Sequence, residues 1–232
     1  MHARTPTEVL RMAGVVSRES VATLRSALWP LARLHPMATP GTSELRPVLM
    51  VHGFLGHPEV FRPLRRRLYL EGWRHVEAVG YPSSRLRLAE IVQRIDAAAR
   101  PLVEAHGPID VVGHSLGAVS TRAWLREFGG ADKVRRFVSL GGPHAGTLLH
   151  RLAPETLGPV LDPAGYWVEL LAEGPEPVDT VVIRARYDQQ VFPPERARLP
   201  GVREVVLEGH GHNGLLWSTA AHDAVVEALR AP

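Results

Sequence analysis

An apolar strand that breaks into a glycine-rich turn and continues as a helix is the feature that most constrains this chain. Residues 109–113 read Ile-Asp-Val-Val-Gly, residues 113–117 read Gly-His-Ser-Leu-Gly, and residues 118–128 favour a helix. In such a G-x-S-x-G turn the serine hydroxyl is pushed clear of the backbone, and the glycines let chain and substrate come close. The pattern predicts a strand, a tight turn and a helix, with Ser115 at the turn as a nucleophile.

From residue 46 onward the sequence alternates between strand-like and helix-like segments. Strands are expected at 47–52, 75–81, 109–113, 134–140, 179–186 and 202–207. The chain of 232 residues is long enough to bury one sizeable core. Alternation of this kind is typical of a mainly parallel sheet with helices on both faces. We therefore expect an α/β domain over residues 46–232, built on about six strands.

Two segments lie outside this alternation. Residues 1–45 have apolar residues at helical spacing and end in prolines and a glycine, which predicts an N-terminal helical extension and a linker. Packing against the core is the simpler interpretation of this extension, and a substrate-side flap or a surface-seeking amphipathic helix is the alternative. Residues 148–177 are rich in leucine but divided by proline and glycine. They predict either a small cap that forms an acyl-chain wall or a short helix packed on the sheet.

A second motif precedes the serine. Residues 47–51 form an apolar strand that runs into residues 52–56, His-Gly-Phe-Leu-Gly. When a nucleophile attacks an ester carbonyl, negative charge develops on its oxygen, and each backbone N–H aimed at that oxygen contributes roughly 3–4 kcal/mol. We expect these oxyanion-hole donors to be the amides of Phe54 and of Leu116, the residue after the nucleophile. His52 is expected to hold the loop by hydrogen bonds rather than to react.

A serine nucleophile on such a turn needs an acid and then a histidine base later in the chain. Asp188 follows the fifth expected strand, and both His210 and His212 follow the sixth. The small residues Gly211 and Gly214 on either side of His212 favour it as the base, with His210 as the competitor. The competing acids are Asp162, Asp179 and Asp223. They lie in a proline-rich insertion, at the start of a strand and inside the last helix, so a surface role suits each of them better.

Together these motifs resemble the α/β-hydrolase superfamily and, within it, the small bacterial triacylglycerol lipases and esterases. The resemblance covers residues 46–232 and rests on residues 52–54, 109–117, 140–147 and 209–216. Residues 140–147 are similar to a Gly-Thr-Pro-His-x-Gly-Thr loop of these lipases. Residues 209–216 nearly reproduce their Gly-x-Gly-His-x-Gly-Leu-Leu loop. This resemblance puts the catalytic histidine at His212.

The resemblance implies an α/β-hydrolase fold and hydrolysis of carboxylic esters by a Ser115, His212 and Asp188 triad, through an acyl-enzyme and without a cofactor. The departures from the family pattern are Ala118, Gly142 and His210, and none removes a triad member. A thioesterase or an acyltransferase would use the same triad with a different pocket or acceptor. A non-catalytic binding module of hydrolase fold is the remaining alternative, and the complete triad argues against it.

Apolar side chains on loops at the carboxyl ends of the strands are expected to bind the substrate. They are Leu55, Trp167, Val191, Phe192 and Leu215. Because ligand pockets are lined mostly by apolar groups, these residues predict an aliphatic acyl group carried by a small-molecule or lipid ester.

The composition argues against several other classes of function. The formal net charge is +3 and Lys133 is the only lysine, which does not favour a nucleic-acid partner. The arginines within residues 62–67 fall on an expected amphipathic helix, where a solvated face is the ordinary explanation. The chain has no cysteine, and its 12 histidines include no H-E-x-x-H pair, so we expect no metal site.

The sequence has no apolar run of 18 residues, so we expect no membrane span, and transient contact with a lipid surface is compatible with this. Residues 1–8 lack the features of a secretory signal. We expect the chain as written to carry no export signal, which favours the cytoplasm, although a secreted form already freed of its leader would look the same. No feature of the sequence indicates an oligomeric state.

Overall fold

Six parallel strands form one sheet in the computed structural model, which describes residues 6–28 and 44–232. The strands are β1 (Val48–Val51), β2 (Val76–Val79), β3 (Ile109–His114), β4 (Val134–Leu140), β5 (Asp179–Ala185) and β6 (Arg203–Leu207). Their order across the sheet is β2-β1-β3-β4-β5-β6, and every neighbouring pair is parallel. The expected α/β fold is therefore confirmed, and each strand lies within two residues of its predicted position. The expected linker between the N-terminal helix and the sheet falls mainly on residues 29–43, outside the described residues.

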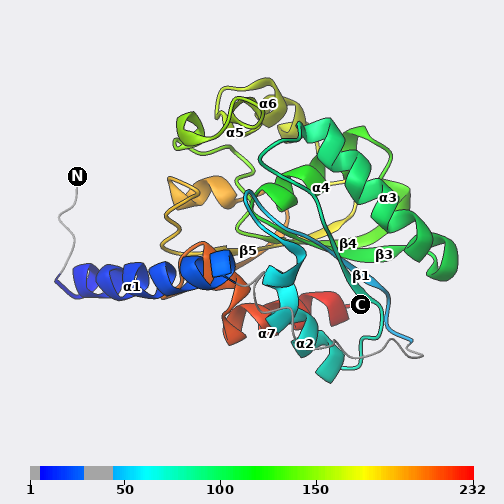
Figure 1. Ribbon diagram of the computed structural model, residues 1–232, viewed down its shortest axis with the longest axis horizontal. Coiled ribbons are helices and arrows are strands. Elements are labelled where there is room, and N and C mark those ends of the chain that lie inside the picture. The colour runs from blue at the N-terminus through cyan, green and yellow to red at the C-terminus, as the bar shows by residue number, and fades with distance from the viewer. Residues whose placement is uncertain (1–5, 29–43) are drawn as a thin grey trace.

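Helices cover both faces of the sheet. The α-helices are α1 (Pro6–Leu28), α2 (Arg62–Leu70), α3 (Leu88–His106), α4 (Leu116–Glu127), α5 (Gly158–Leu161), α6 (Tyr166–Ala172) and α7 (Thr219–Arg230). Short 3-10 helices are η2 (Pro58–Phe61), η3 (Ala131–Lys133), η4 (His150–Leu152), η5 (Pro194–Ala197) and η6 (Asn213–Leu216). Figure 1 shows α3 and α4 on one face of the sheet and α2 and α7 on the other. None of the helices that the structure describes is long and apolar enough to cross a membrane.

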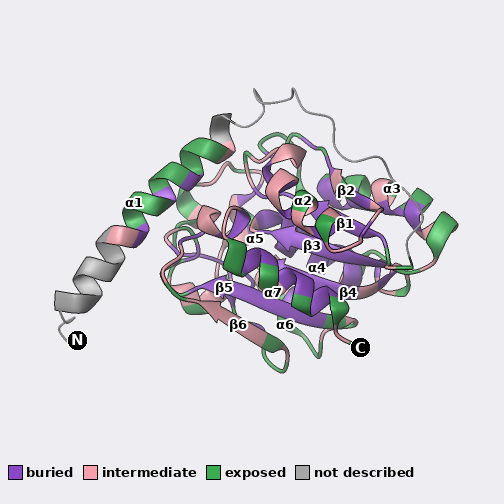
Figure 2. Ribbon diagram, turned by 90° about the horizontal axis from the view of Figure 1, so that it is seen from below, coloured by how far each residue is buried: buried purple, intermediate pink, exposed green. Residues whose placement is uncertain are grey.

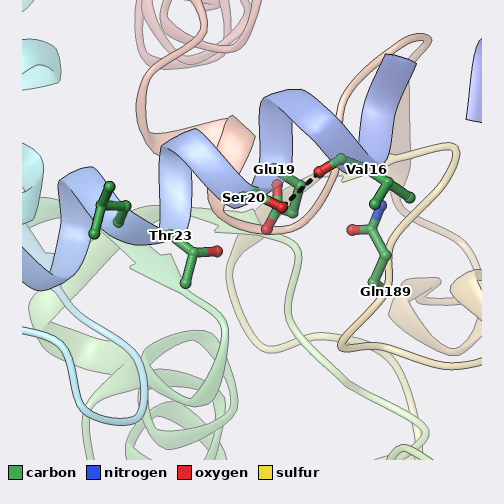
Figure 3. Close-up of a pocket in the computed structure, with 6 residues that line it drawn as sticks. Val16, Glu19, Ser20, Thr23 and Gln189 are labelled. Carbon is green, nitrogen blue, oxygen red and sulfur yellow. Dashed lines mark hydrogen bonds between the residues drawn. The ribbon is translucent and has the colours of Figure 1, made fainter. Parts of the chain in front are cut away.

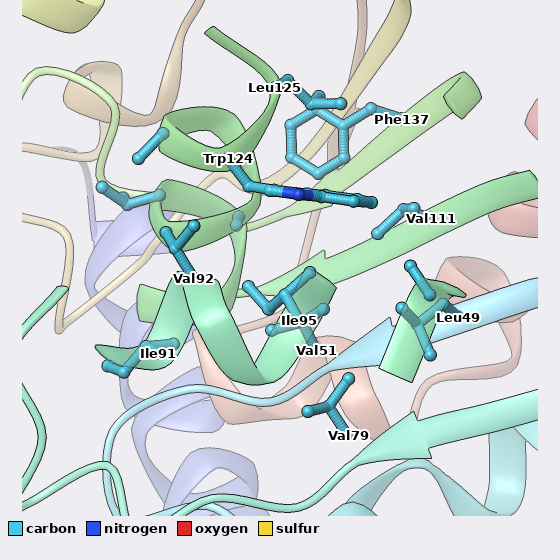
Figure 4. Close-up of a cluster of buried hydrophobic side chains, with 14 of the residues drawn as sticks. Leu49, Val51, Val79, Ile91, Val92, Ile95, Val111, Trp124, Leu125 and Phe137 are labelled. Atoms are coloured by element: carbon cyan, nitrogen blue, oxygen red, sulfur yellow. The ribbon is translucent and has the colours of Figure 1, made fainter. Parts of the chain in front are cut away.

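Strand β1 is a continuous apolar run, as expected of a central parallel strand with both faces buried. In β1, Leu49 and Val51 join the hydrophobic cluster under α3 and α4. Val48 and Met50 point to the opposite face and join the cluster under α2 and α7. Figure 4 shows the first cluster, in which Trp124 of α4 and Phe137 of β4 lie among side chains of α3. Burial weakens at the two edges of the sheet, in β2 and in β6, and Figure 2 shows β6 as largely intermediate.

The first helix packs beside the last loops of the chain. Figure 1 shows α1 extending along one end of the sheet, at the left of the view. In the part whose side chains are described, Val15, Glu19 and Ala22 are buried, whereas Val16, Val21 and Leu24 are about half exposed. The simpler interpretation of the extension, packing against the core, agrees with this arrangement.

The segment 148–177 packs on α4 rather than standing away from the sheet. Leu157, Val160 and Leu171 are buried in the same cluster as α4. A buried ion pair adds to this contact: Arg122 of α4 lies 2.7 Å from the Glu176 carboxylate, with the two side chains 3% and 5% exposed. Burial lowers the pKa of the Arg122 guanidinium, although the adjacent Glu176 favours its charged form.

Replacing Glu176 with alanine should destabilise the protein by about 3–5 kcal/mol, because it leaves a buried guanidinium without its counter-charge. Urea denaturation followed by tryptophan fluorescence measures this change. The control is Glu173→Ala, which removes an exposed carboxylate from the same segment and should change the free energy of unfolding by less than about 0.5 kcal/mol. Equal stabilities of the two variants would contradict the role assigned to the ion pair.

Candidate active site

Ser115 lies on the sharp turn between β3 and α4. Its backbone angles are φ 57° and ψ −125°, a left-handed conformation that costs a non-glycine residue on the order of 1–3 kcal/mol. A Cβ at Gly117 would lie 2.1 Å from the Val51 carbonyl oxygen, and a Cβ at Gly113 would lie 2.7 Å from Ala118 Cα. Only glycine fits at these two positions, which explains the spacing of the motif.

The loop after β1 lies directly against this turn. A Cβ at Gly53 would be 2.8 Å from Ser115 Cβ and 3.3 Å from Ser115 Oγ. Within residues 44–232, the amide N–H groups of Phe54 and Leu116 donate to no protein acceptor. Phe54 follows Gly53, which contacts Ser115, and Leu116 follows Ser115 itself. Both unused amide donors therefore belong to residues next to this contact, as an oxyanion site requires.

His52 holds this loop in place. Its Nδ1–H donates to the Gly53 carbonyl oxygen at 2.9 Å, and its ring stacks on Tyr81 with the centroids 4.1 Å apart. The Tyr81 hydroxyl donates to the His52 carbonyl oxygen. Burial lowers the pKa of His52 to about 4, so its ring is neutral at ordinary pH. This environment agrees with the supporting role expected from the sequence.

Asp188 and His212 form the buried hydrogen bond that the sequence predicts. His212 Nδ1 donates to Asp188 Oδ2 at 2.8 Å, and each side chain is 1% exposed. The other carboxylate oxygen of Asp188 accepts the amides of Gln190 at 2.8 Å and Val191 at 2.7 Å. The remaining ring nitrogen, His212 Nε2, is buried and has no hydrogen-bond partner among the described residues. A free Nε2 opposite a carboxylate-bound Nδ1 is the arrangement that a general base needs.

Opposing influences act on the pKa of His212. Burial pulls it down, but the negative charge of Asp188 and its hydrogen bond raise it, and the charge of Glu19 on α1 adds to the increase. The net result is a pKa above the ordinary histidine value of 6.5.

Two contacts link the surroundings of Ser115 to those of His212. The Ser115 amide donates to the Leu140 carbonyl oxygen at 3.0 Å, and a Cβ on the next residue, Gly141, would lie 3.4 Å from His212 Nδ1. His114, which precedes the serine, has its ring centroid 4.9 Å from that of His212. The two motifs are therefore neighbours in space, although about one hundred residues separate them.

The motif at residues 140–147 fastens the loop that carries Asp188. The Thr147 hydroxyl donates to the Gln190 carbonyl oxygen at 2.8 Å and accepts the Phe192 amide at 3.0 Å. In the same motif, His144 Nε2 lies 2.7 Å from Ser139 Oγ. Burial holds the pKa of His144 well below its usual value, so this histidine is neutral.

The competing candidates have other partners. His210 bonds to the Glu208 carbonyl oxygen and to Ser218 Oγ, each at 2.6 Å, and makes no hydrogen bond to Asp188. Asp179 pairs with Arg136, and Asp223 pairs with Arg67. Asp162 accepts the Ala164 amide in its own turn. The geometry thus favours Asp188 and His212.

The expected substrate-binding residues occupy three different environments. Leu55 and Phe192 are 73% and 49% exposed, so they offer apolar surface on the two loops nearest the site. Val191 and Leu215 are buried, the first beside the Asp188 carboxylate and the second against Gly141. Trp167 packs on Phe128, with the ring centroids 6.5 Å apart, at the opposite end of α4 from Ser115. The structure does not bring Trp167 to the nucleophile.

One residue of this region has no counterpart in the sequence motifs. Glu19 of α1 contacts the loop that carries His212. Its only signal in the sequence is a carboxylate on the same helical face as Val15 and Ala22. Elsewhere in the described residues, no cluster of three or more histidine, aspartate or glutamate side chains could hold a metal ion.

Comparisons with known proteins identify a matching family and similar folds. The sequence model of the palmitoyl protein thioesterase family matches residues 47–162. A mature lipase of Bacillus licheniformis superposes with a TM-score of 0.70 at 14% identity, over 84% of this chain and 96% of that one. A metagenome-derived lipolytic enzyme gives 0.63 at 18% identity, over 85% and 99%. A thioesterase domain from the curacin biosynthetic pathway gives 0.60 at 16% identity, over 83% and 93%. At these identities the structures show a shared fold.

Neutralising Asp188 should lower the pKa of His212. In Asp188→Asn the amide oxygen can still accept the Nδ1–H bond, but the negative charge that stabilises the imidazolium is gone. NMR titration of the His212 ring protons, assigned with a His212→Gln variant, measures this pKa. Asp223→Asn, which neutralises an exposed carboxylate on α7, is the control and should leave the titration unchanged. A His212 pKa that does not move in Asp188→Asn would show that the pair does not form in solution.

Proposed function

This chain belongs to the palmitoyl protein thioesterase family of α/β hydrolases, and we propose that it hydrolyses carboxylic esters with Ser115 as nucleophile, His212 as base and Asp188 as acid. The family match and the shared fold also confirm the resemblance seen in the sequence motifs. The observation that carries the proposal is the buried 2.8 Å bond between His212 Nδ1 and Asp188, which leaves His212 Nε2 without a partner among the described residues.

The proposed reaction has two halves. In the first, Ser115 Oγ bonds to the ester carbonyl carbon while its proton moves to His212 Nε2, and Asp188 stabilises the imidazolium. The amides of Phe54 and Leu116 donate to the oxyanion that forms. The carbon–oxygen bond to the alcohol then breaks, and His212 gives its proton to the departing oxygen. In the second half, His212 takes a proton from water, the hydroxide attacks the acyl-enzyme, and the acid leaves as the proton returns to Ser115.

The exposed apolar surface favours an aliphatic acyl group. Leu55 and Phe192 are the two expected substrate contacts that are open to solvent. Leu148 is 52% exposed, and its amide donates to the Phe192 carbonyl oxygen. A third exposed apolar residue therefore belongs to the same group of loops. Val191 and Leu215 are buried in the loops that carry Asp188 and His212.

Thioester hydrolysis is the second candidate, and the description of the matching family favours it. The same acylation would release a thiol instead of an alcohol. An acyltransferase would replace water by another acceptor in the second half of the reaction. A non-catalytic binding module is the least compatible with an intact, buried pair of Asp188 and His212.

Replacing either Ser115 or His212 with alanine should abolish hydrolysis of p-nitrophenyl butyrate. The triad acts as a unit, so each loss in kcat should be large, on the order of a million-fold. The matched control is His210→Ala, which removes an imidazole from the same loop and should keep most of the activity. A fluorophosphonate probe should label the wild type once, at Ser115.

More than about one per cent of activity in Ser115→Ala, free of wild-type enzyme, would refute the proposed nucleophile. If His210→Ala lost its activity and His212→Ala kept it, the base would be His210 instead.

A panel of p-nitrophenyl esters from acetate to palmitate, run beside matched thioesters, tests the substrate class. We expect ester turnover with a medium aliphatic chain preferred, and Leu55→Ala should reduce that preference while sparing acetate, because acetate is too short to reach this side chain. Leu70→Ala is the matched control: Leu70 is also 73% exposed but lies on α2. Activity confined to thioesters would favour the second candidate and overturn the ester assignment.

A further inference from the structure

Glu19 of helix α1 reaches the loop that carries His212. Its carboxylate accepts the Asn213 amide at 2.6 Å and the Gly214 amide at 2.9 Å. These are the first two amides of η6, the short helix that begins directly after His212, and the opening amides of a helix have no partner within it. No side chain of η6 itself caps this end, so Glu19 supplies the cap from another part of the chain.

The same carboxylate lies close to the glycine that precedes His212. A Cβ at Gly211 would lie 2.5 Å from Glu19 Oε2 and 2.5 Å from Gln189 Oε1. Gln189 follows the acid Asp188. Helix α1, the loop that carries Asp188 and the loop that carries His212 therefore meet at Gly211. Figure 3 shows Glu19 and Gln189 on the two walls of one hollow, formed by α1 and the loop after β5.

Two further bonds hold α1 in this position. The Asn213 side-chain amide donates to Thr23 Oγ1 at 2.9 Å, and Trp217 Nε1 donates to Ser26 Oγ at 3.1 Å. Thr23 and Ser26 lie one and two turns beyond Glu19 on the same helix. Helix α1 is therefore bonded to η6 at Asn213, its first residue, and to Trp217, the residue that follows it.

The charge of Glu19 also acts on His212. Glu19 is 8% exposed, and no ion pair of the described residues includes it, so no cation beside it cancels its charge. The titratable groups that face His212 are Asp188, Glu19 and His114. Burial keeps the pKa of His114 well below its usual value, so the neutral His114 leaves the two carboxylates to set the charge around His212.

We propose that Glu19 is a positioning residue of the active site: its carboxylate fixes the loop directly after His212, so that helix α1 helps to hold the catalytic base. This inference rests on the proposed function, in which His212 is the base. Glu19 touches no reacting atom and acts through the amides of Asn213 and Gly214.

The test is Glu19→Gln in the full chain, assayed on p-nitrophenyl butyrate. Its side chain has the same length, but it lacks the charge and offers only one acceptor oxygen to the two amides. We expect kcat to fall about 10- to 100-fold, as for a small misplacement of a catalytic group, with KM changed by less than about threefold. The acid limb of the kcat profile should move to lower pH, because loss of the carboxylate lowers the pKa of His212 and the neutral base then persists in more acidic solution.

Ser20→Ala is the matched control, because it removes from the same helix an exposed hydroxyl that bonds only to the Val16 carbonyl oxygen, without changing any charge. It should keep kcat within about twofold of the wild type and leave the acid limb in place. A purely structural role for Glu19 would lower kcat in Glu19→Gln without moving the acid limb. Wild-type kcat and an unmoved acid limb in Glu19→Gln would overturn the proposal.

Two measurements separate this proposal from the proposed function. NMR titration of His212 in Ser115→Ala, with and without Glu19→Gln, reports the influence of Glu19 without any turnover, and an unchanged His212 pKa would overturn it. Hydrogen exchange is measured on the wild type, so it does not depend on a variant that folds. The amides of Asn213 and Gly214 should be protected. Exchange at the rate of free amides would exclude their hydrogen bonds to Glu19. Failure of the proposed function would appear instead as retained activity in Ser115→Ala itself.

Discussion

The close approach of backbones around Ser115 is the constraint on which the rest of the site depends. Gly117 lies so near β1 that a side chain there would collide with the Val51 carbonyl, and Gly53 lies against Ser115 itself. The left-handed conformation of Ser115 persists because these contacts, and the buried strands on either side, leave the turn no room to relax. The buried strands β1 and β3 thus hold the Ser115 side chain clear of its own backbone.

The pair of Asp188 and His212 shows how a carboxylate can remain in the interior next to that turn. A buried carboxylate is costly unless hydrogen bonds satisfy it. Asp188 receives three, from the His212 ring and from the amides of Gln190 and Val191. Two of these donors belong to its own loop, and Thr147 fixes that loop from the neighbouring motif. The orientation of the imidazole is therefore set largely by backbone geometry, which a change of surface side chains leaves intact.

Structural features that depend on local sequence could be predicted, whereas features that depend on contacts between distant residues could not. The strands could be predicted because a parallel sheet buries both faces, and the motif around Ser115 because its glycine spacing is visible within five consecutive residues. Glu19 could not be found in this way, since 194 residues separate it from Asn213 and a glutamate on a helix normally faces solvent. Trp167 illustrates a second limit: its contact with Phe128, a residue outside the leucine-rich insertion, has no signal in the local sequence.

The contact between α1 and the loop that carries His212 has a consequence for the order in which the fold assembles. Glu19 precedes Asn213 and Gly214 by 194 and 195 positions. Contacts of such long range form late, after the local strand and helix units are in place. Most of the sheet can thus assemble while Glu19 still has no amides to bind. The loop after His212 would then take its final position only in the last steps of folding.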